Sequence, residues 1–303
     1  VPGRQEGSRA VRLDRGTVEA RPYPVKGRTF SVEMWFRHHG QGSLPGPNIL
    51  ESGTLVSLGD GHFTGWRLSL RFPEQMLLFE IGSRSGPVGL TAASPVAADV
   101  WHHVVATWDG ETMRLYLNGA LTGVRAYTGT FSPARDDTKF RVGFVGNGLG
   151  SVRFDVDELA LYARELSAAT VMQRAHLEVA FDWAGEAATA FWAADDLLGA
   201  RKSREAAEAF REIALRPDVP PQLASVAAWT GASLYLDDDI DQAFEVFAQI
   251  AQSDRFVMTS RRMALEEMIR LRGRGAFSAD RPEVYQGVLA ALPLHPQTEE
   301  VRV

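Results

Sequence analysis

Carboxylate side chains gather in one short run of the sequence. Asp155, Asp157 and Glu158 occur in the string Asp-Val-Asp-Glu, inside a stretch that alternates like a β-strand. Because side chains alternate between the two faces of a strand, Asp155 and Asp157 share one face and Glu158 points to the other. With Asp14 from an early strand and backbone carbonyl groups, the two aspartates form a candidate site for calcium, which takes six or more oxygen ligands. The alternative is that Asp157 accepts backbone N–H bonds where the closing strand meets the first strand.

The same carboxylates raise the question of glycoside hydrolysis. A retaining glycosidase needs two carboxyl groups about 5 Å apart, and the string here lacks a matching pair of glutamates. The sequence contains no Gly-x-Ser-x-Gly nucleophile elbow and no His-Glu-x-x-His zinc helix. We therefore predict that the protein has no catalytic residues and is not an enzyme.

Two pairs of adjacent histidines suggest a zinc site at first sight. These pairs are His38-His39 and His102-His103, and both fall in strand patterns. Adjacent residues on a strand point to opposite faces, so neither pair can bind one ion through both rings. We expect these rings to brace the sheet through hydrogen bonds. A cross-strand pair of His39 with His103 depends on a strand pairing that the sequence does not give.

Aromatic side chains on loops are candidates for stacking against sugar rings. Several lie in or beside glycine-rich segments, where polar neighbours are available to bind sugar hydroxyl groups. The predicted ligand-binding residues are Trp66, Asp60, His62, Arg84 and Tyr127. By contrast, Trp35, Trp101 and Trp108 belong to strong strand patterns, and we expect them in the core.

The elements that must position these residues are mostly strands up to about Tyr162. The segment Trp101–Gly119 reads as two strands, with a turn at Asp109-Gly110 and another at Asn118-Gly119. The other expected strands are Ala10–Asp14, Thr17–Arg21, Thr29–His39, Asn48–Leu58, Gly65–Phe72, Met76–Gly82, Val88–Ala93, Phe140–Val145 and Phe154–Tyr162. No helical run separates them, so the strands must be antiparallel, and their number predicts a sandwich of two sheets.

The pattern becomes helical after Glu165. Ser167 is placed to cap a short helix, and six longer helical runs follow, over 184–200, 203–215, 221–236, 240–253, 257–272 and 282–291. A shift of 37 residues takes Trp192 to Trp229 and Phe210 to Phe247, so helical hairpins repeat, with a partial third unit after Phe256. The sequence thus predicts a β-domain over 1–178 followed by a helical-repeat domain over 179–303.

Composition excludes several classes of protein. The net charge of −6 and the absence of a basic run argue against a nucleic-acid partner. With no cysteine in 303 residues, disulfides and thiolate metal sites are excluded. No run approaches the roughly 20 apolar residues of a membrane helix, so we expect no membrane span. The chain begins at Val1 without a leader, which we interpret as a trimmed or mature form.

Four stretches of the first half carry a family resemblance. They are Phe30–Phe36, Trp101–Gly110, Leu115–Gly119 and Phe154–Ser167, and their order and spacing resemble the LamG-like domains of the concanavalin A-like lectin and glucanase superfold. The resemblance implies a jelly-roll fold that binds glycans or proteins, often beside a calcium ion. Glucanases of this superfold carry catalytic carboxylates in a Glu-x-Asp-x-x-Glu-like pattern, from which the Asp-Val-Asp-Glu string departs. The second half is similar to tetratricopeptide repeats, which implies a groove for a partner protein.

These expectations combine into one hypothesis. The protein is a non-enzymatic binding or scaffold protein, whose sandwich recognises a carbohydrate or a protein and whose helical repeats mediate protein interaction. Calcium is the only expected cofactor, and the resemblance favours an exported protein. One alternative is a purely structural or assembly protein without ligand binding, and the other is a carbohydrate-active enzyme.

Overall fold

The computed structural model describes most of the chain as two compact units. The described residues are 1–14, 16–20, 29–41, 52–135, 137–143, 152–176, 178–236, 238–273 and 282–291. One unit is Val1–Leu166 and the other is Ser167–Val303. These units meet at 166/167, whereas the sequence predicts a domain border at 178/179, and the border stays a prediction because compactness alone does not define a domain.

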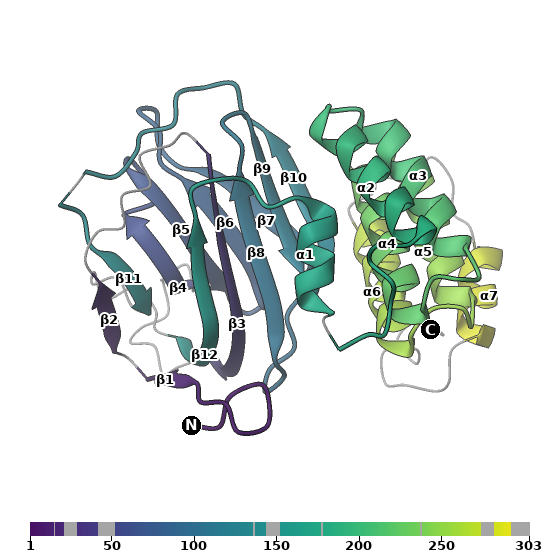
Figure 1. Cartoon of the computed structure of the whole chain (residues 1–303), viewed down its shortest axis with the longest axis horizontal. Coiled ribbons are helices and arrows are strands. Elements are labelled where there is room, and N and C mark those ends of the chain that lie inside the picture. The colour runs from purple at the N-terminus through teal and green to yellow at the C-terminus, as the bar shows by residue number, and fades with distance from the viewer. Residues whose placement is uncertain are drawn as a thin grey trace. The chain divides into compact units, whose positions relative to one another are not determined.

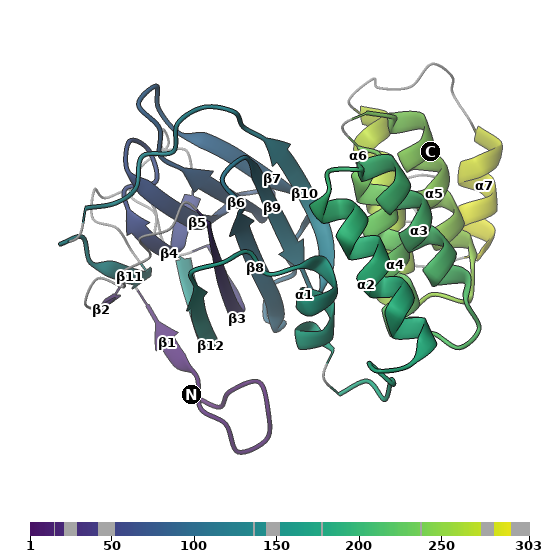
Figure 2. The ribbon, with the colours of Figure 1, turned by 45° about the horizontal axis from the view of Figure 1, so that its top comes forward.

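The first unit is a sandwich of two antiparallel sheets (Figures 1 and 2). One sheet contains, in order, β1 (Val11–Leu13), β12 (Val152–Tyr162), β3 (Phe30–Gln41), β8 (His102–Trp108), β9 (Thr112–Leu117) and β10 (Ala120–Ala126). The other contains β2 (Thr17–Ala20), β11 (Phe140–Gly143), β4 (Ser52–Gly59), β5 (Gly65–Arg71), β6 (Met76–Ile81) and β7 (Val88–Pro95). The predicted antiparallel sandwich is confirmed.

Strand β10 is the one described strand that the sequence pattern does not predict. It follows the turn at Asn118-Gly119, where both residues have positive φ angles of 51° and 85°, as a two-residue hairpin turn of type I′ requires. Gly123 lies at an irregularity in the pairing of β10 with β9, and the strand carries few large apolar residues. The sequence pattern of β10 alternates too weakly to predict a strand, and the preceding turn determines that the segment pairs with β9.

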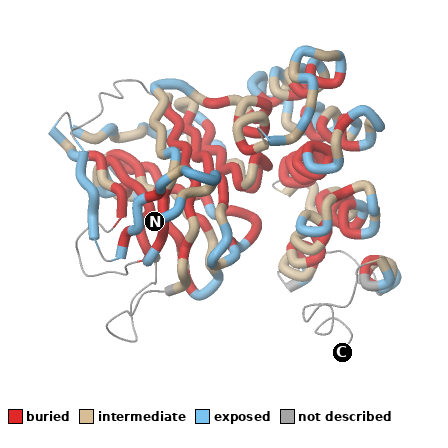
Figure 3. The backbone as a smooth tube through the Cα atoms, turned by 60° about the horizontal axis from the view of Figure 1, so that its bottom comes forward, coloured by how far each residue is buried: buried red, intermediate tan, exposed pale blue. Residues whose placement is uncertain are grey.

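The core lies between the two sheets. Along β3, Phe30, Val32, Met34 and Phe36 are fully buried members of the core, so the residues between them must face the other side of the sheet. Figure 3 shows burial running along most of the strands of the sandwich. The outer face of the sheet that contains β3 therefore carries the side chains of the alternate positions, among them Glu33, Trp35 and Arg37.

The second unit consists of helices. Its described helices are α1 (Ala168–Ala175), α2 (Glu186–Gly199), α3 (Ser203–Leu215), α4 (Pro221–Leu234), α5 (Ile240–Gln252), α6 (Met258–Gly273) and α7 (Pro282–Ala291). Ser167 caps α1 as predicted, because its hydroxyl accepts a bond from the Thr170 amide at 3.3 Å. None of the helices in the described ranges is long and apolar enough to cross a membrane.

One pair of helices has the predicted spacing of 37 residues, whereas α2 and α4 begin 35 residues apart. Helices α3 and α5 both begin and both end 37 residues apart. Trp229 of α4 packs on Phe247 of α5, with ring centroids 4.9 Å apart, whereas its sequence counterpart Trp192 is only half-buried. A C-terminal region of helices is confirmed, while membership of the tetratricopeptide family stays a prediction.

Candidate functional site

One buried carboxylate organises the outer face of the first sheet. Asp155 on β12 lies directly across from Arg12 on β1 and from Arg37 on β3, so the three side chains form a row over three neighbouring strands. Arg12 donates from Nε to Oδ1 at 2.7 Å and from Nη2 to Oδ2 at 3.0 Å. Arg37 donates to Oδ2 from Nε at 3.1 Å and from Nη2 at 2.7 Å. The Asp155 side chain has no exposed surface, so the two arginines supply the solvation that water would give.

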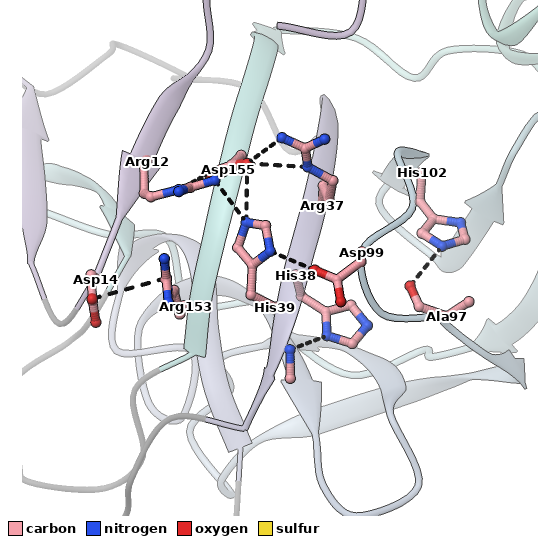
Figure 4. Close-up of polar contacts among 11 residues, drawn as sticks. Arg12, Asp14, Arg37, His38, His39, Ala97, Asp99, His102, Arg153 and Asp155 are labelled. Carbon is pink, nitrogen blue, oxygen red and sulfur yellow. Dashed lines mark hydrogen bonds and ion pairs between the residues drawn. The ribbon is translucent and has the colours of Figure 1, made fainter. Parts of the chain in front are cut away.

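A histidine links this row to a loop. Nε2 of His39 lies 3.0 Å from Oδ2 of Asp155, and its Nδ1 lies 2.7 Å from Oδ1 of Asp99 (Figure 4). Asp99 belongs to the connection between β7 and β8. We call the group of Arg12, Arg37, His39, Asp99 and Asp155 the Asp155 cluster.

The cluster fixes the charge of Asp155. Burial alone would raise the pKa of this carboxyl group, but hydrogen bonds from Arg12, Arg37 and His39 outweigh it and hold the pKa far below its ordinary value. The carboxylate is therefore ionised across the physiological pH range, and it cannot donate a proton as a general acid.

The expected calcium site does not fit this geometry. Both oxygens of Asp155 face cationic or N–H donors, which would repel a cation. Asp157 accepts bonds from the amides of Arg4 at 3.1 Å and Glu158 at 2.9 Å. These are backbone N–H bonds, as the alternative interpretation expected, but the donors lie before β1 and within β12 rather than in the first strand. Asp14 lies 4.0 Å from Arg153, not beside the other two aspartates. In the described part of the chain, no group of three or more His, Cys, Asp or Glu side chains is placed to hold a metal ion.

Chelation tests this correction directly. We expect EDTA to leave the melting temperature of the intact protein unchanged, because arginines rather than a metal ion neutralise Asp155. Differential scanning calorimetry with EDTA and with added calcium measures this, since a bound ion would raise stability by linkage. A calcium-dependent rise in melting temperature that disappears in Asp157→Asn would contradict our interpretation.

His38 and His102 hold the neighbouring loop from inside the sandwich. Nε2 of His38 lies 3.0 Å from the carbonyl oxygen of Val96, and Nε2 of His102 lies 3.1 Å from that of Ala97. Since a carbonyl group only accepts, each ring carries its proton on Nε2. The Nδ1 atoms then accept, at 3.3 Å from the amide nitrogen of Gly40 and at 3.2 Å from the Asn118 amide group. Both neutral rings are fully used in bracing, and burial lowers the pKa of His102 to about 4.

The tryptophans expected in the core divide between two locations. Trp108 lies in the core, whereas Trp35 and Trp101 lie at the outer face. There the guanidinium of Arg4 lies 3.8 Å from the centroid of a Trp35 ring, and that of Arg37 lies 4.8 Å from the centroid of a Trp101 ring. These contacts have cation–π geometry, and they bring Trp101 to the rim of the Asp155 cluster.

The predicted sugar platform at Trp66 is wrong. Trp66 is only 1% exposed and stacks on Phe30 at 5.4 Å between ring centroids. It is the second residue of β5, inside the expected strand, and its side chain faces the core rather than the neighbouring loop. Trp66 is thus a core residue that a sugar cannot reach.

The other predicted ligand residues lie in loops at one end of the sandwich. Asp60 accepts bonds from the amides of His62, Phe63 and Thr64, each at 2.9 Å. The Ser83 amide bonds to the carbonyl oxygen of His62 at 3.3 Å, which brings the turn containing exposed Arg84 beside this loop. Tyr127 packs against the core beside Trp108. As ligand contacts, Asp60, His62, Arg84 and Tyr127 stay predictions.

The sequence does not predict that arginine side chains surround Asp155. Arg12, Arg37 and Asp155 meet only through the register of three strands that are far apart in the sequence. The available signal is weak: each residue is a charged position that alternates with apolar neighbours. Strand order, which the sequence pattern does not give, is what brings them together.

Comparisons with known proteins agree with this architecture. Residues 12–172 match the family described as the concanavalin A-like lectin/glucanases superfamily. A search of curated proteins found no significant match.

A search of solved structures finds partial similarity to three binding domains of other proteins. The binding domain of paraclostridial mosquitocidal protein 1 is 14% identical, with a TM-score of 0.45 over 57% of this chain and 44% of that chain. The binding domain of botulinum neurotoxin DC in complex with SialylT is 13% identical, with a TM-score of 0.41 over 53% of this chain and 39% of that chain. The binding domain of botulinum neurotoxin serotype G is 14% identical, with a TM-score of 0.42 over 57% of this chain and 45% of that chain. The aligned part is less than half of each of these chains. Because the family match covers more than half of its sequence, the chain belongs to the concanavalin A-like lectin/glucanases superfamily.

Proposed function

We propose that the sandwich is a non-enzymatic recognition module that binds an acidic carbohydrate at the Asp155 cluster. The observation that carries the proposal is the state of its two arginines. Arg12 and Arg37 bind Asp155 through Nε and Nη2, and their side chains remain 35% and 25% exposed. Their Nη1 groups make no bond to another described residue, so each guanidinium keeps donors for a ligand.

The chemistry of these donors favours an anionic group. A planar guanidinium matches the geometry of a carboxylate or sulfate and binds it more strongly than a neutral hydroxyl group. Asp155 holds both arginines in place before a ligand arrives, which lowers the entropy cost of binding. Half-buried Trp101 lies beside Arg37 and offers apolar surface to a sugar ring. Uronic acids and sulfated sugars combine these two properties.

The carboxylates of the outer face support the non-enzymatic part of the proposal. The guanidinium groups of Arg12 and Arg37 occupy both carboxylate oxygens of Asp155. Glu33 is buried and bound through Oε1 to Nε2 of His103 at 2.9 Å and through Oε2 to the hydroxyl of Tyr162 at 2.6 Å. A glycosidase needs an acid and a second carboxylate that both reach the sugar, and neither of these groups is placed to do so.

A glycan array with variants tests the proposal. We expect binding to glycans with uronic acid or sulfate groups, and about a tenfold loss of affinity in Arg12→Gln, which removes one charged donor. Arg37→Gln should weaken binding similarly. Arg153→Gln is the matched control, because Arg153 lies on the same strand as Asp155 but its ion pair is with Asp14, at 4.0 Å. Isothermal titration calorimetry on array hits measures the affinities, and melting temperatures verify that each variant is folded.

The remaining hypotheses give different results in the same experiment. Equal binding of neutral and acidic glycans, or equal affinities of Arg12→Gln and the unmodified protein, would overturn the proposal. A blank array with concentration-dependent oligomers would favour a structural or assembly protein. Release of reducing ends from a polysaccharide would show an enzyme. The proposal includes an exported protein, because acidic polysaccharides are found mainly outside the cell, and fractionation of the producing cells tests that location.

A further inference from the structure

A groove in the helical unit lies between the second helices of two successive hairpins. Helices α3 and α5 both pack on α4 and are neighbours in both ribbon views (Figures 1 and 2). A pocket of about 350 Å³ lies between them, and Ala228 is the residue of α4 that lines it. This volume falls within the range of sites that bind ligands.

The lining of the groove is apolar with a polar edge. Its residues are Arg211, Ala214 and Leu215 of α3, Ala228 of α4, Val246, Gln249, Ile250 and Gln252 of α5, and the following Ser253 and Phe256. Leu215 is 73% exposed although it belongs to this lining, so the groove offers apolar surface that water now covers. Of these lining residues, only Arg211 is charged, and it lies 3.4 Å from the side-chain oxygen of Gln249 across the groove.

The end of the groove is rigidly built. Arg255, which follows α5, donates to three carbonyl oxygens at and after the end of α3, those of Ala214, Arg216 and Val219. Val257 donates to the Ser225 hydroxyl of α4 at 2.9 Å. These bonds tie α3, α4 and the end of α5 together. The groove therefore exists before a ligand binds, which favours affinity.

We propose that this groove binds a peptide segment of another protein, in which a large apolar side chain lies next to an acidic residue. The apolar side chain fills the space over Ala228 and covers Leu215, and the carboxylate pairs with Arg211. Burial of Leu215 supplies hydrophobic free energy, and the arginine supplies orientation and charge selectivity. This inference goes beyond the proposed glycan site, because it concerns a different unit and a different class of ligand.

Peptide display on the intact protein tests the groove. A random dodecapeptide library is the probe, and we expect enrichment of sequences with Leu, Met or Phe beside Asp or Glu. The enriched peptides are then synthesised with a fluorescein label, and affinity is measured by fluorescence polarisation. We expect at least tenfold weaker binding to Leu215→Glu and to Arg211→Glu. The control is Arg204→Glu, because Arg204 is an exposed arginine of the same helix that pairs with Asp239 at 3.4 Å, outside the groove.

The outcomes separate this inference from its alternatives. Failure to enrich any peptide, or peptides that bind Leu215→Glu and Arg211→Glu as tightly as the unmodified protein, would overturn it. Enrichment of basic peptides would also overturn it, because Arg211 would repel them. Self-association weakened by Arg211→Glu, with no enriched peptide, would assign the groove to a second copy of the chain instead. Glycan binding by the sandwich is measured independently, so either proposal can fail alone.

Discussion

Replacement of Asp155 by asparagine is expected to destabilise the sandwich by about 3 kcal/mol, near the lower end of the cost of removing one partner from a buried ion pair. The substitution keeps the shape of the side chain but removes the charge that Arg12 and Arg37 share. The two guanidinium groups then face each other across β12 without a counter-ion. Their partial exposure to water places the expected loss at the lower end of the range.

Hydrogen exchange resolved on peptides from β1, β3 and β12 measures this loss in the sandwich itself, because the helical unit need not unfold with it. Asp14→Asn is the matched control, since Asp14 is exposed and lies 4.0 Å from its partner. We expect almost no change there, as for most exposed ion pairs. A loss in Asp155→Asn no larger than in Asp14→Asn would show that the cluster contributes nothing to stability.

Acidification is expected to weaken the sandwich from about pH 6.5 downward, above the range in which most carboxyl groups protonate. His102 has a folded-state pKa of about 4 because of burial, against about 6.5 in the unfolded chain. The unfolded state therefore binds the proton first, so the stabilisation is complete above about pH 6.5 and is lost as pH falls toward about 4, at a cost of about 3 kcal/mol. Burial lowers the pKa of His38 in the same direction, although Asp99 opposes the shift. The depressed pKa of Asp155 adds to this loss below about pH 5, where the same carboxyl group begins to protonate in the unfolded chain.

Urea unfolding followed by circular dichroism, at steps from about pH 7 to about pH 4, measures this dependence. His102→Gln should be less stable near neutrality, because it loses the bond from Asn118, but its stability should fall less on acidification. The double variant with His38→Gln should be flatter still. A His102→Gln variant with the same pH dependence as the unmodified protein would show that the ring is not the group that titrates.

The sandwich follows from the sequence because its alternation is strong where two sheets must enclose a core. The segments around Phe30 and Phe154 alternate and become β3 and β12, and the run rich in aromatic and β-branched residues that ends at Trp108 becomes β8. Strand β10 is missed because a turn, rather than its own residues, determines it. Trp66 is misplaced because it lies near the start of its strand beside glycines, where the sequence pattern does not show whether the ring faces the loop or the core.

The candidate site is harder to predict than the fold. Alternation places Asp155 and Asp157 on one face, but the residues opposite them depend on strand order. The order β1-β12-β3 puts an arginine on each side of Asp155, and this turns an expected cation site into a cluster that already contains its cations. The helical groove escapes sequence analysis for a similar reason, because Arg211 and Gln249 meet only through the packing of α3 and α5 on α4.

The pairing of Arg12 with Asp155 also closes the sandwich, since it joins the first strand to the last across 143 positions of the chain. The chain contains no cysteine, so this ion pair links the two distant strands in the way that a disulfide could. A noncovalent ion pair does not limit the conformations of the unfolded chain, so it adds none of the entropic stabilisation that a covalent cross-link provides. In return, the closure of the sandwich does not depend on the redox potential of its surroundings, and it forms equally well in reducing and oxidising compartments.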